Sequence, residues 1–141
     1  MLLDANLLLY AVNTRAPQNA RAATWLDECL NGSRRVGIPW QSLGAFLRIS
    51  THPRAFAQPL RPAEAWDLVD AWLAAPAAWT PVPGANYAKL LGDVVVRHEV
   101  SGNLVPDAQL AALALEHGLT VCSADTDFAR FTDVRWENPL A

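Results

Sequence analysis

The sequence predicts an alternating α/β fold, and two similar units near its ends carry that prediction. Close to the C-terminus, a helix beginning at Pro106 ends at Gly118 and leads into the apolar segment 119–122. A turn with two acids, 123–127, follows directly. At the N-terminus, the apolar residues 1–3 are likewise followed by an acid. A helix, a glycine, a buried strand and an acid-bearing turn in this order are typical of alternating α/β proteins.

The remaining elements are predicted from the spacing of apolar residues and from the positions of proline and glycine. Apolar residues recur at helical spacing in 18–30, and Asn31-Gly32 provides a helix end. Pro62 suits the first position of a helix, where its missing N–H group has no helical partner to lose. In chain order, we expect helices over 18–30, 41–50, 62–76, 85–97 and 106–117, and strands over 1–3, 36–38, 79–82, 119–122 and 134–136.

Length and composition predict one domain spanning residues 1–141. A hydrophobic fraction of 52% and a charged fraction of 18% indicate a well-filled core, with some apolar surface left for a partner. The formal charge of -3 argues against a protein that coats nucleic acid by charge alone, but it does not exclude a nuclease. Carboxylates that gather at a metal site contribute negative charge until the metal binds.

Other features exclude several classes of protein. We expect a cytoplasmic protein, because the N-terminus has no secretory pattern and no apolar run reaches the length of a membrane span. Cys29 and Cys122 form no CxxC pair, and the histidines His52, His98 and His117 have no zinc-ligand spacing. A zinc site is therefore not expected.

Four aspartates are the candidate site residues: Asp4, Asp107, Asp125 and Asp127. Asp4 follows the first strand and the pair at 125 and 127 follows another, so a parallel sheet would bring them to the same edge. Asp107 lies at a helix N-terminus that can reach this edge through a loop. Clustered carboxylates repel one another unless a cation compensates, and hard oxygen ligands suit Mg²⁺ or Mn²⁺. Such a metal can promote phosphodiester hydrolysis.

Each aspartate also has a structural alternative that stays open at this point. Asp4 could cap a helix beginning near Leu7, and Asp107 could serve as a capping or dipole residue. Asp125 and Asp127 could be ordinary turn residues. A single metal site has the advantage of explaining all four positions. The segment 125–127 also fits a phosphatase-like DxD, but that motif normally follows the first strand.

Arginine and tryptophan are weaker candidates for RNA contacts. Arginines 48, 54, 130 and 135 lie beside aromatic residues and could touch RNA, although solvated side chains are the simpler interpretation. The tryptophans are expected in the core or at a partner interface rather than as base-stacking platforms.

Three blocks of the sequence, in order, resemble the PIN-domain ribonucleases, and the match looks closest to VapC-type toxins of toxin–antitoxin pairs. The blocks are Leu2-Leu3-Asp4-Ala5-Asn6, the helix 107–114 and Ser123-Ala124-Asp125-Thr126-Asp127-Phe128. The resemblance spans nearly the whole chain. It implies a three-layer α/β/α sandwich around a mainly parallel sheet of about four to five strands.

The resemblance also implies an activity and partners. It implies Mg²⁺- or Mn²⁺-dependent endonucleolytic cleavage of RNA, homodimerisation and inhibition by a VapB-like antitoxin. By matching position, Asp4, Asp107 and Asp125 become the metal ligands and Asp127 an accessory catalytic acid. Asn6 or Ser123 would give polar support. The alternative is a weakly active or inactive PIN-like domain that binds RNA or a protein.

One departure from the family pattern motivates that alternative. The pattern usually includes another acid on the helix after the second strand, yet no Asp or Glu occurs from Cys29 through Ala63. The region Gln41–Arg48 therefore lacks it. Gln41 or Ser42 could replace it through a water molecule, or Glu116 could assist from another helix.

Overall fold

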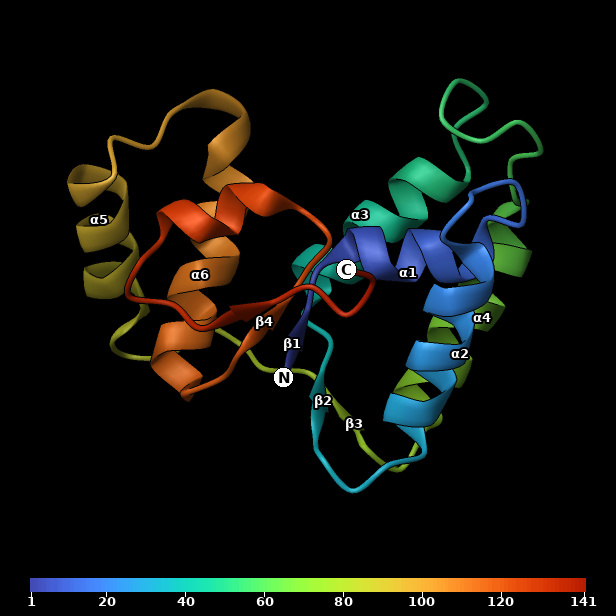
Figure 1. Ribbon diagram of the computed structural model, residues 1–141, viewed down its shortest axis with the longest axis horizontal. Coiled ribbons are helices and arrows are strands. Elements are labelled where there is room, and N and C mark those ends of the chain that lie inside the picture. Colours follow the sequence, from blue (N-terminus) through green and yellow to red (C-terminus); the bar gives the residue numbers. More distant parts are fainter.

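The computed structural model describes residues 1–141 and contains a five-stranded sheet in which every pairing is parallel. The strand order β3-β2-β1-β4-β5 places the N-terminal strand at the centre (Figure 1). The strands are β1 (Leu2–Leu3), β2 (Val36–Gly37), β3 (Ala78–Trp79), β4 (Val121–Cys122) and β5 (Trp136–Glu137). The helices are α1 (Ala5–Val12), α2 (Asn19–Leu30), α3 (Trp40–Ser50), α4 (Pro62–Ala74), α5 (Tyr87–Arg97) and α6 (Val105–His117). Two 3₁₀ turns complete the fold: η1 (Gly102–Leu104) and η2 (Thr126–Arg130).

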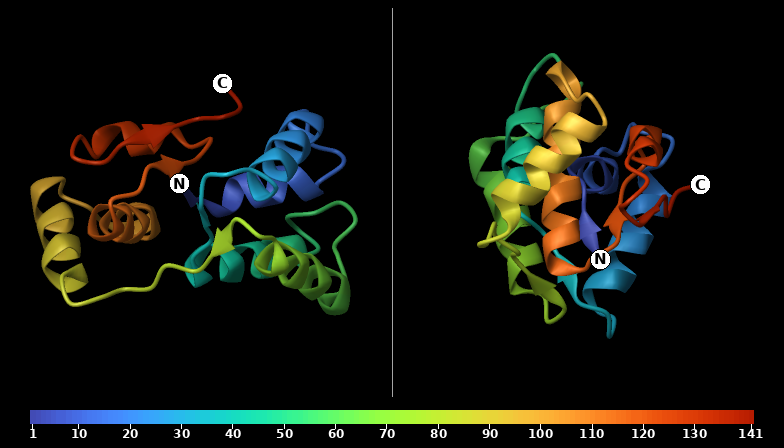
Figure 2. Two further views of the ribbon diagram at one scale, coloured as in Figure 1. Left: turned by 90° about the horizontal axis from the view of Figure 1, so that it is seen from below. Right: turned by 90° about the vertical axis from the view of Figure 1, so that its left-hand side faces the viewer.

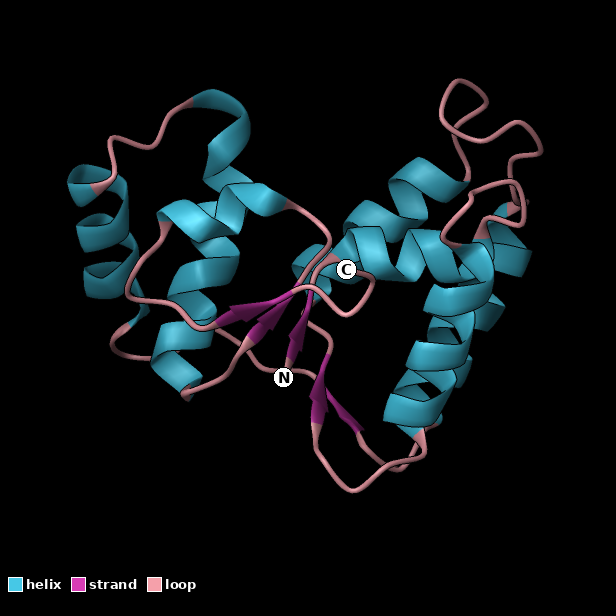
Figure 3. Cartoon of the chain, viewed as in Figure 1, coloured by secondary structure: helices cyan, strands magenta, loops and turns pink.

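The two faces of the sheet are covered by different helices. Leu3 and Cys122 pack with buried residues of α1 to α4, whereas Leu2 and Val121 pack with α5, α6 and η2. Neighbouring residues of one strand point to opposite faces, so these short strands are buried on both sides. Figures 2 and 3 show the strands between the two groups of helices. The predicted three-layer α/β/α class is confirmed, and the five strands agree with the prediction of about four to five.

Local signals in the sequence set several element ends. Gly118 ends α6 with a φ of 66°, a left-handed conformation that glycine adopts without a Cβ penalty. Pro62 begins α4 as expected. The strand predicted over 79–82 is shorter, because Pro81 and Pro83 have no N–H group to continue the ladder.

Other element bounds differ by a few residues. α1 begins at Ala5, directly after Asp4, rather than near Leu7. The last strand is Trp136–Glu137 instead of 134–136. None of the helices combines the length and apolar character that crossing a membrane requires.

Candidate metal centre

The four sequence-predicted aspartates lie at the sheet edge where β1 and β4 end. The Asp4 backbone N–H donates to the Cys122 carbonyl at 3.0 Å, so the two chain segments leave the sheet side by side. Asp107 lies in the first turn of α6. The negative charges of Asp4, Asp125 and Asp127 all raise its pKa, which requires the four groups to be close.

The tightest group of carboxylates consists of Asp107, Asp125 and Asp127. One oxygen from each lies within 4.8 Å of the other two. Asp107 and Asp125 are half-buried and Asp127 is exposed. This grouping includes Asp127, to which the sequence analysis gave only an accessory role, and it leaves Asp4 beside the trio. Oxygen ligands at this spacing can hold a divalent cation.

Asp125 combines a turn role with a free oxygen. Its Oδ1 accepts a hydrogen bond from the Asp127 N–H at 2.8 Å and so begins η2. Its other oxygen has no hydrogen-bond partner in the protein. The turn interpretation is therefore correct but incomplete, because the turn itself fixes both acids at the sheet edge.

Asp4 occupies the N-cap position of α1 without capping the helix through its side chain. Its Oδ2 instead accepts from the Ser123 hydroxyl at 2.7 Å and from Asn6 Nδ2 at 3.4 Å. The same buried Ser123 hydroxyl accepts from Asn6 Nδ2 and from the Asp125 N–H, both at 3.0 Å. Ser123 and Asn6 thus connect the ends of two neighbouring strands.

Burial and like charge perturb two of the acids. Burial is the main cause that raises the pKa of Asp4, against the opposing hydrogen bond from Ser123. For Asp107, burial first and then the three neighbouring carboxylates raise the pKa to about 7, although Arg130 acts in the opposite direction. A cation bound among these acids would relieve their repulsion and favour the charged forms.

Sequence comparison assigns the chain to a family. A sequence model of the PIN domain matches residues 1–134. The chain belongs to the PIN-domain family. Ribonuclease VapC37 from Mycobacterium tuberculosis is 44% identical over 140 residues, which cover 99% of this chain and 97% of the relative. Ribonuclease VapC33 from the same species is 39% identical, with 97% of this chain and 96% of the relative covered.

Solved structures with the same fold support the architecture of this PIN domain. VapBC2 from Rickettsia felis, bound to a DNA fragment from their promoter, gives a TM-score of 0.67 at 17% identity over 97% of this chain and 96% of that chain. VapBC-1 from nontypeable Haemophilus influenzae gives a TM-score of 0.67 at 16% identity, with 99% and 98% covered.

The three candidates for the missing helix acid have different environments in this PIN domain. Ser42 is buried and its hydroxyl donates to the Leu3 carbonyl at 2.7 Å. Glu116 lies nine residues from Asp107, about 13 Å along α6, and accepts from two backbone N–H groups there. Gln41 remains beside the acids, where its Nε2 donates to the Pro106 carbonyl at 2.6 Å. Its side-chain oxygen has no partner in the protein.

A hollow of about 330 Å³ opens next to the acids, between the first turns of α1, α3 and α6. Asp4 and Asp107 line it from one side, and Trp40, Gln41 and Arg48 line it from α3. The sequence alone does not predict that Trp40 lines this hollow. Trp40 follows the second strand, however, and this position puts it at the same sheet edge as the acids.

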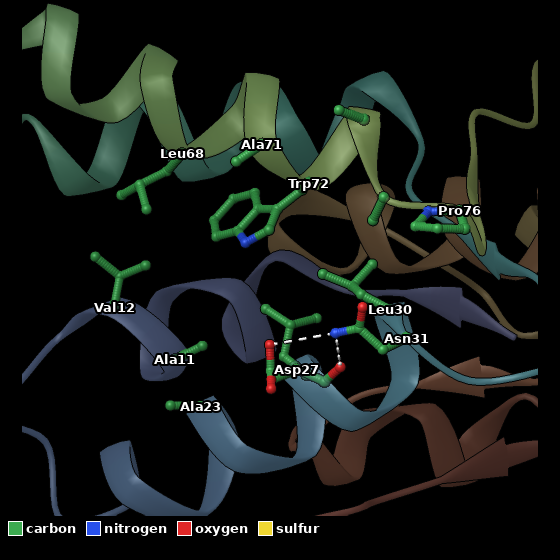
Figure 4. A pocket seen from close by; sticks show the side chains of 13 residues that line it. Ala11, Val12, Ala23, Asp27, Leu30, Asn31, Leu68, Ala71, Trp72 and Pro76 are labelled. Carbon is green, nitrogen blue, oxygen red and sulfur yellow. Dashed lines mark hydrogen bonds between the residues drawn. The ribbon is translucent and has the colours of Figure 1, made fainter.

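A second hollow, of about 450 Å³, is largely apolar and lies away from the acids between α1, α2 and α4. Figure 4 shows Val12, Leu30 and Trp72 around it, each from a different helix. Trp72 also packs edge-on against Phe46, with ring centroids 4.7 Å apart. Trp72 is buried, in agreement with the expectation that the tryptophans lie in the core or at a partner interface, whereas Trp40 and Trp66 are exposed.

Proposed function

We propose that this PIN domain is a metal-dependent endoribonuclease that acts as the toxin of a toxin–antitoxin pair. The observation that carries the proposal is the trio Asp107, Asp125 and Asp127, with carboxylate oxygens within 4.8 Å of one another. Two relatives that align over nearly the whole chain are named ribonucleases. The acidic trio gives this chain the groups that such hydrolysis needs.

The trio would hold Mg²⁺ or Mn²⁺, because both ions prefer carboxylate oxygens. Asp4 adds its Oδ1, which neither Ser123 nor Asn6 contacts. When bound, the cation would orient a water molecule and neutralise negative charge on the phosphate. The chain then needs no nucleophilic side chain.

The chain's own residues keep the acids in place before the metal binds. The Ser123 hydroxyl donates to the carboxylate of Asp4, which follows β1. It also accepts from the backbone N–H of Asp125, which begins the turn after β4. The Asp127 N–H donates to Asp125 Oδ1 and so holds this side chain in the turn, where one of its oxygens lies within 4.8 Å of oxygens of Asp107 and Asp127. Such preorganisation lowers the cost of gathering negative charge at one point.

The test is cleavage of total cellular RNA by the purified, antitoxin-free protein in Mn²⁺. Discrete cleavage that EDTA blocks and that Asp107→Asn abolishes would support the proposal. Asp70→Asn is the matched control, because Asp70 is an exposed acid on α4 outside the trio. Full cleavage by folded Asp107→Asn protein would overturn the proposed site.

The weakly active alternative is favoured by one observation, the absence of an acid on α3, where Gln41 faces the site instead. In that case the domain would act by binding RNA or protein. The same incubation decides between the two, because discrete EDTA-sensitive cleavage rules out an inactive domain. Intact RNA in Mn²⁺, with the protein folded, would favour the alternative.

The partner in this proposal is a VapB-like antitoxin that places an amphipathic segment in the apolar hollow of α1, α2 and α4. Two solved structures similar to this chain are structures of VapBC proteins. The lining side chains, including Val12, Leu68 and Trp72, offer an apolar surface for the apolar face of a helix. The toxin itself is expected to form a homodimer.

A charged residue in this hollow should separate antitoxin binding from catalysis. Leu68→Glu is expected to abolish co-purification with the cognate antitoxin while RNA cleavage persists. Ala88→Glu is the control, because Ala88 is exposed on α5 outside the hollow. Wild-type antitoxin binding by Leu68→Glu would contradict the assignment of the hollow.

A further inference from the structure

We propose that α3 and the loop that follows it bind an unpaired RNA strand beside the metal centre. In this arrangement Trp40 stacks on one base, and Arg48 and Arg54 contact phosphates. The inference rests on the proposed function, because it assigns the path of the substrate through the same site. It extends that function from the acids that cleave to the residues that hold the strand.

Trp40 has the position and exposure of a stacking residue. It is the first residue of α3, and 52% of its surface is exposed, whereas the core residues of the same helix are fully buried. It lines the hollow of about 330 Å³ together with Asp4 and Asp107. An open indole face at this point can stack on the base next to a phosphate held at the acids.

Arg48 connects this hollow to a second one. It lies eight residues after Trp40, about 12 Å along α3. It lines both the hollow at the acids and a further hollow of about 250 Å³ that also includes His52 and Arg54. Figure 1 shows α3 running from the sheet edge at the centre to this loop at the upper right.

The charges along this path are free to bind phosphate. The ion pairs of the chain involve Arg34, Arg61 and Arg97, so neither Arg48 nor Arg54 has a carboxylate partner. No acidic residue occurs from Cys29 through Ala63. In a protein of net charge -3, Arg48 and Arg54 therefore place unpaired positive charge on the path that leads away from the acidic centre.

Stacking on an indole requires a base that has left its own helix. Proteins that recognise RNA by sequence mostly bind single-stranded loops and ends, where bases can stack on aromatic side chains. A duplex would present its phosphates to Arg48 but no free base to Trp40. An unpaired strand can therefore contact both Trp40 and Arg48, whereas a duplex can contact only Arg48.

The test measures binding separately from cleavage. The anisotropy of a short fluorescein-labelled uridine RNA is followed in EDTA, so that no cutting occurs, and the same RNA annealed to its complement serves as the duplex probe. Trp40→Ala should weaken binding of the single strand about tenfold, whereas Trp40→Phe retains most of the affinity. Trp66→Ala is the control, because Trp66 is 47% exposed on α4 and lines neither hollow.

Salt dependence distinguishes the arginines from the tryptophan. Arg48→Gln and Arg54→Gln should each reduce the slope of log affinity against log salt by about 0.7, the effect of losing one phosphate contact on a single strand. Trp40→Ala should leave this slope unchanged. Lys89→Gln on α5, an exposed cation outside both hollows, should change neither the affinity nor the slope.

Failure of this inference is distinguishable from failure of the proposed function. Wild-type cleavage of RNA combined with unchanged probe binding by Trp40→Ala and Arg48→Gln would overturn the inference alone. Dissociation of a dimer by Trp40→Ala, with unchanged probe affinity per chain, would assign α3 to an interface between copies and also overturn it. Probe binding that depends on Trp40 in a protein that cuts no RNA would support the inference and refute the nuclease.

Discussion

The two ends of α6 each carry a carboxylate, and the two groups have opposite surroundings. Asp107 at the N-terminal end faces three other acids, which with burial raise its pKa to about 7. Glu116 at the C-terminal end accepts from the N–H groups of Gly84 and Asn86 at 2.7 and 2.9 Å. Both oxygens of Glu116 accept backbone hydrogen bonds, whereas Asp107 is left to bind a ligand. The hydrogen-bond partners of each carboxylate therefore separate a structural acid from a functional one.

The strongest test of this contrast exchanges the acids for amides. Asp107→Asn should lower RNA cleavage by more than about a hundredfold, because even residues that merely support a metal ligand contribute up to that much. Glu116→Gln should leave cleavage close to wild type. Initial rates on total RNA in Mn²⁺ measure both. Equal losses of RNA cleavage in the two variants would show that Asp107 and Glu116 do not differ in their contribution to catalysis.

A smaller effect is expected at the residue that positions the acids. Ser123→Ala removes the hydroxyl that donates to Asp4 and accepts from the Asp125 N–H. We expect Mn²⁺ affinity to fall by about tenfold to a hundredfold with the fold retained. Isothermal titration measures the affinity, and circular dichroism checks the fold. Wild-type affinity would mean that Asp4 and Asp125 need no support from Ser123.

The structural role of Glu116 predicts a modest loss of stability. Glu116→Gln keeps one acceptor oxygen and loses the other, so one of the two bonds to the segment before α5 is lost. The expected cost is about 1 kcal/mol of unfolding free energy. Urea denaturation measures it, with Asp70→Asn on α4 as the exposed-acid control. A stability equal to wild type would contradict the structural role.

A separate effect concerns the pH dependence of stability in the metal-free protein. Because the pKa of Asp107 is raised to about 7 in the fold, the folded state holds a proton that the unfolded state has already lost. Metal-free stability should therefore decline as pH rises from about 4 to about 7. The decline should be weaker in Asp107→Asn. Tm values in EDTA across this range measure it, and a Tm that rises equally in both proteins would refute the assignment.

Mn²⁺ should oppose this decline, since it binds the charged form of the acids. The gain in Tm on adding Mn²⁺ should be larger at pH 8 than at pH 5. In Asp107→Asn the gain should be small at both values.

Several parts of the fold were predictable because their causes are local. Gly118 ends α6 and Pro62 begins α4 through backbone restrictions that act within one or two residues. The strand over 79–82 is shorter than its apolar spacing predicts, because Pro81 within it and Pro83 after it have no N–H group to continue the ladder. The shortened strand pairs in parallel with β2 at the edge of the sheet.

The candidate site was predictable in its members but not in its grouping. A strand followed by an acid places Asp4 and Asp125 at one edge of any parallel sheet, so the sequence was enough to bring them together. Which carboxylates form the tightest trio depends on where the first turn of α6 places Asp107 relative to the turn of Asp125 and Asp127. The bond from Ser123 to Asp4 joins residues 119 positions apart, and no local pattern indicates it.

The sequence by itself determined the α/β class, the start of α4, the end of α6 and the four aspartates that gather at one sheet edge, because apolar spacing and backbone restrictions are encoded locally. Only the tertiary structure decided that Asp127 joins Asp107 and Asp125 in the tightest group. It also gave Glu116 a structural role and brought Trp40 beside the acids. These outcomes depend on contacts between segments far apart in the chain, and such contacts form only when the helices pack on the sheet.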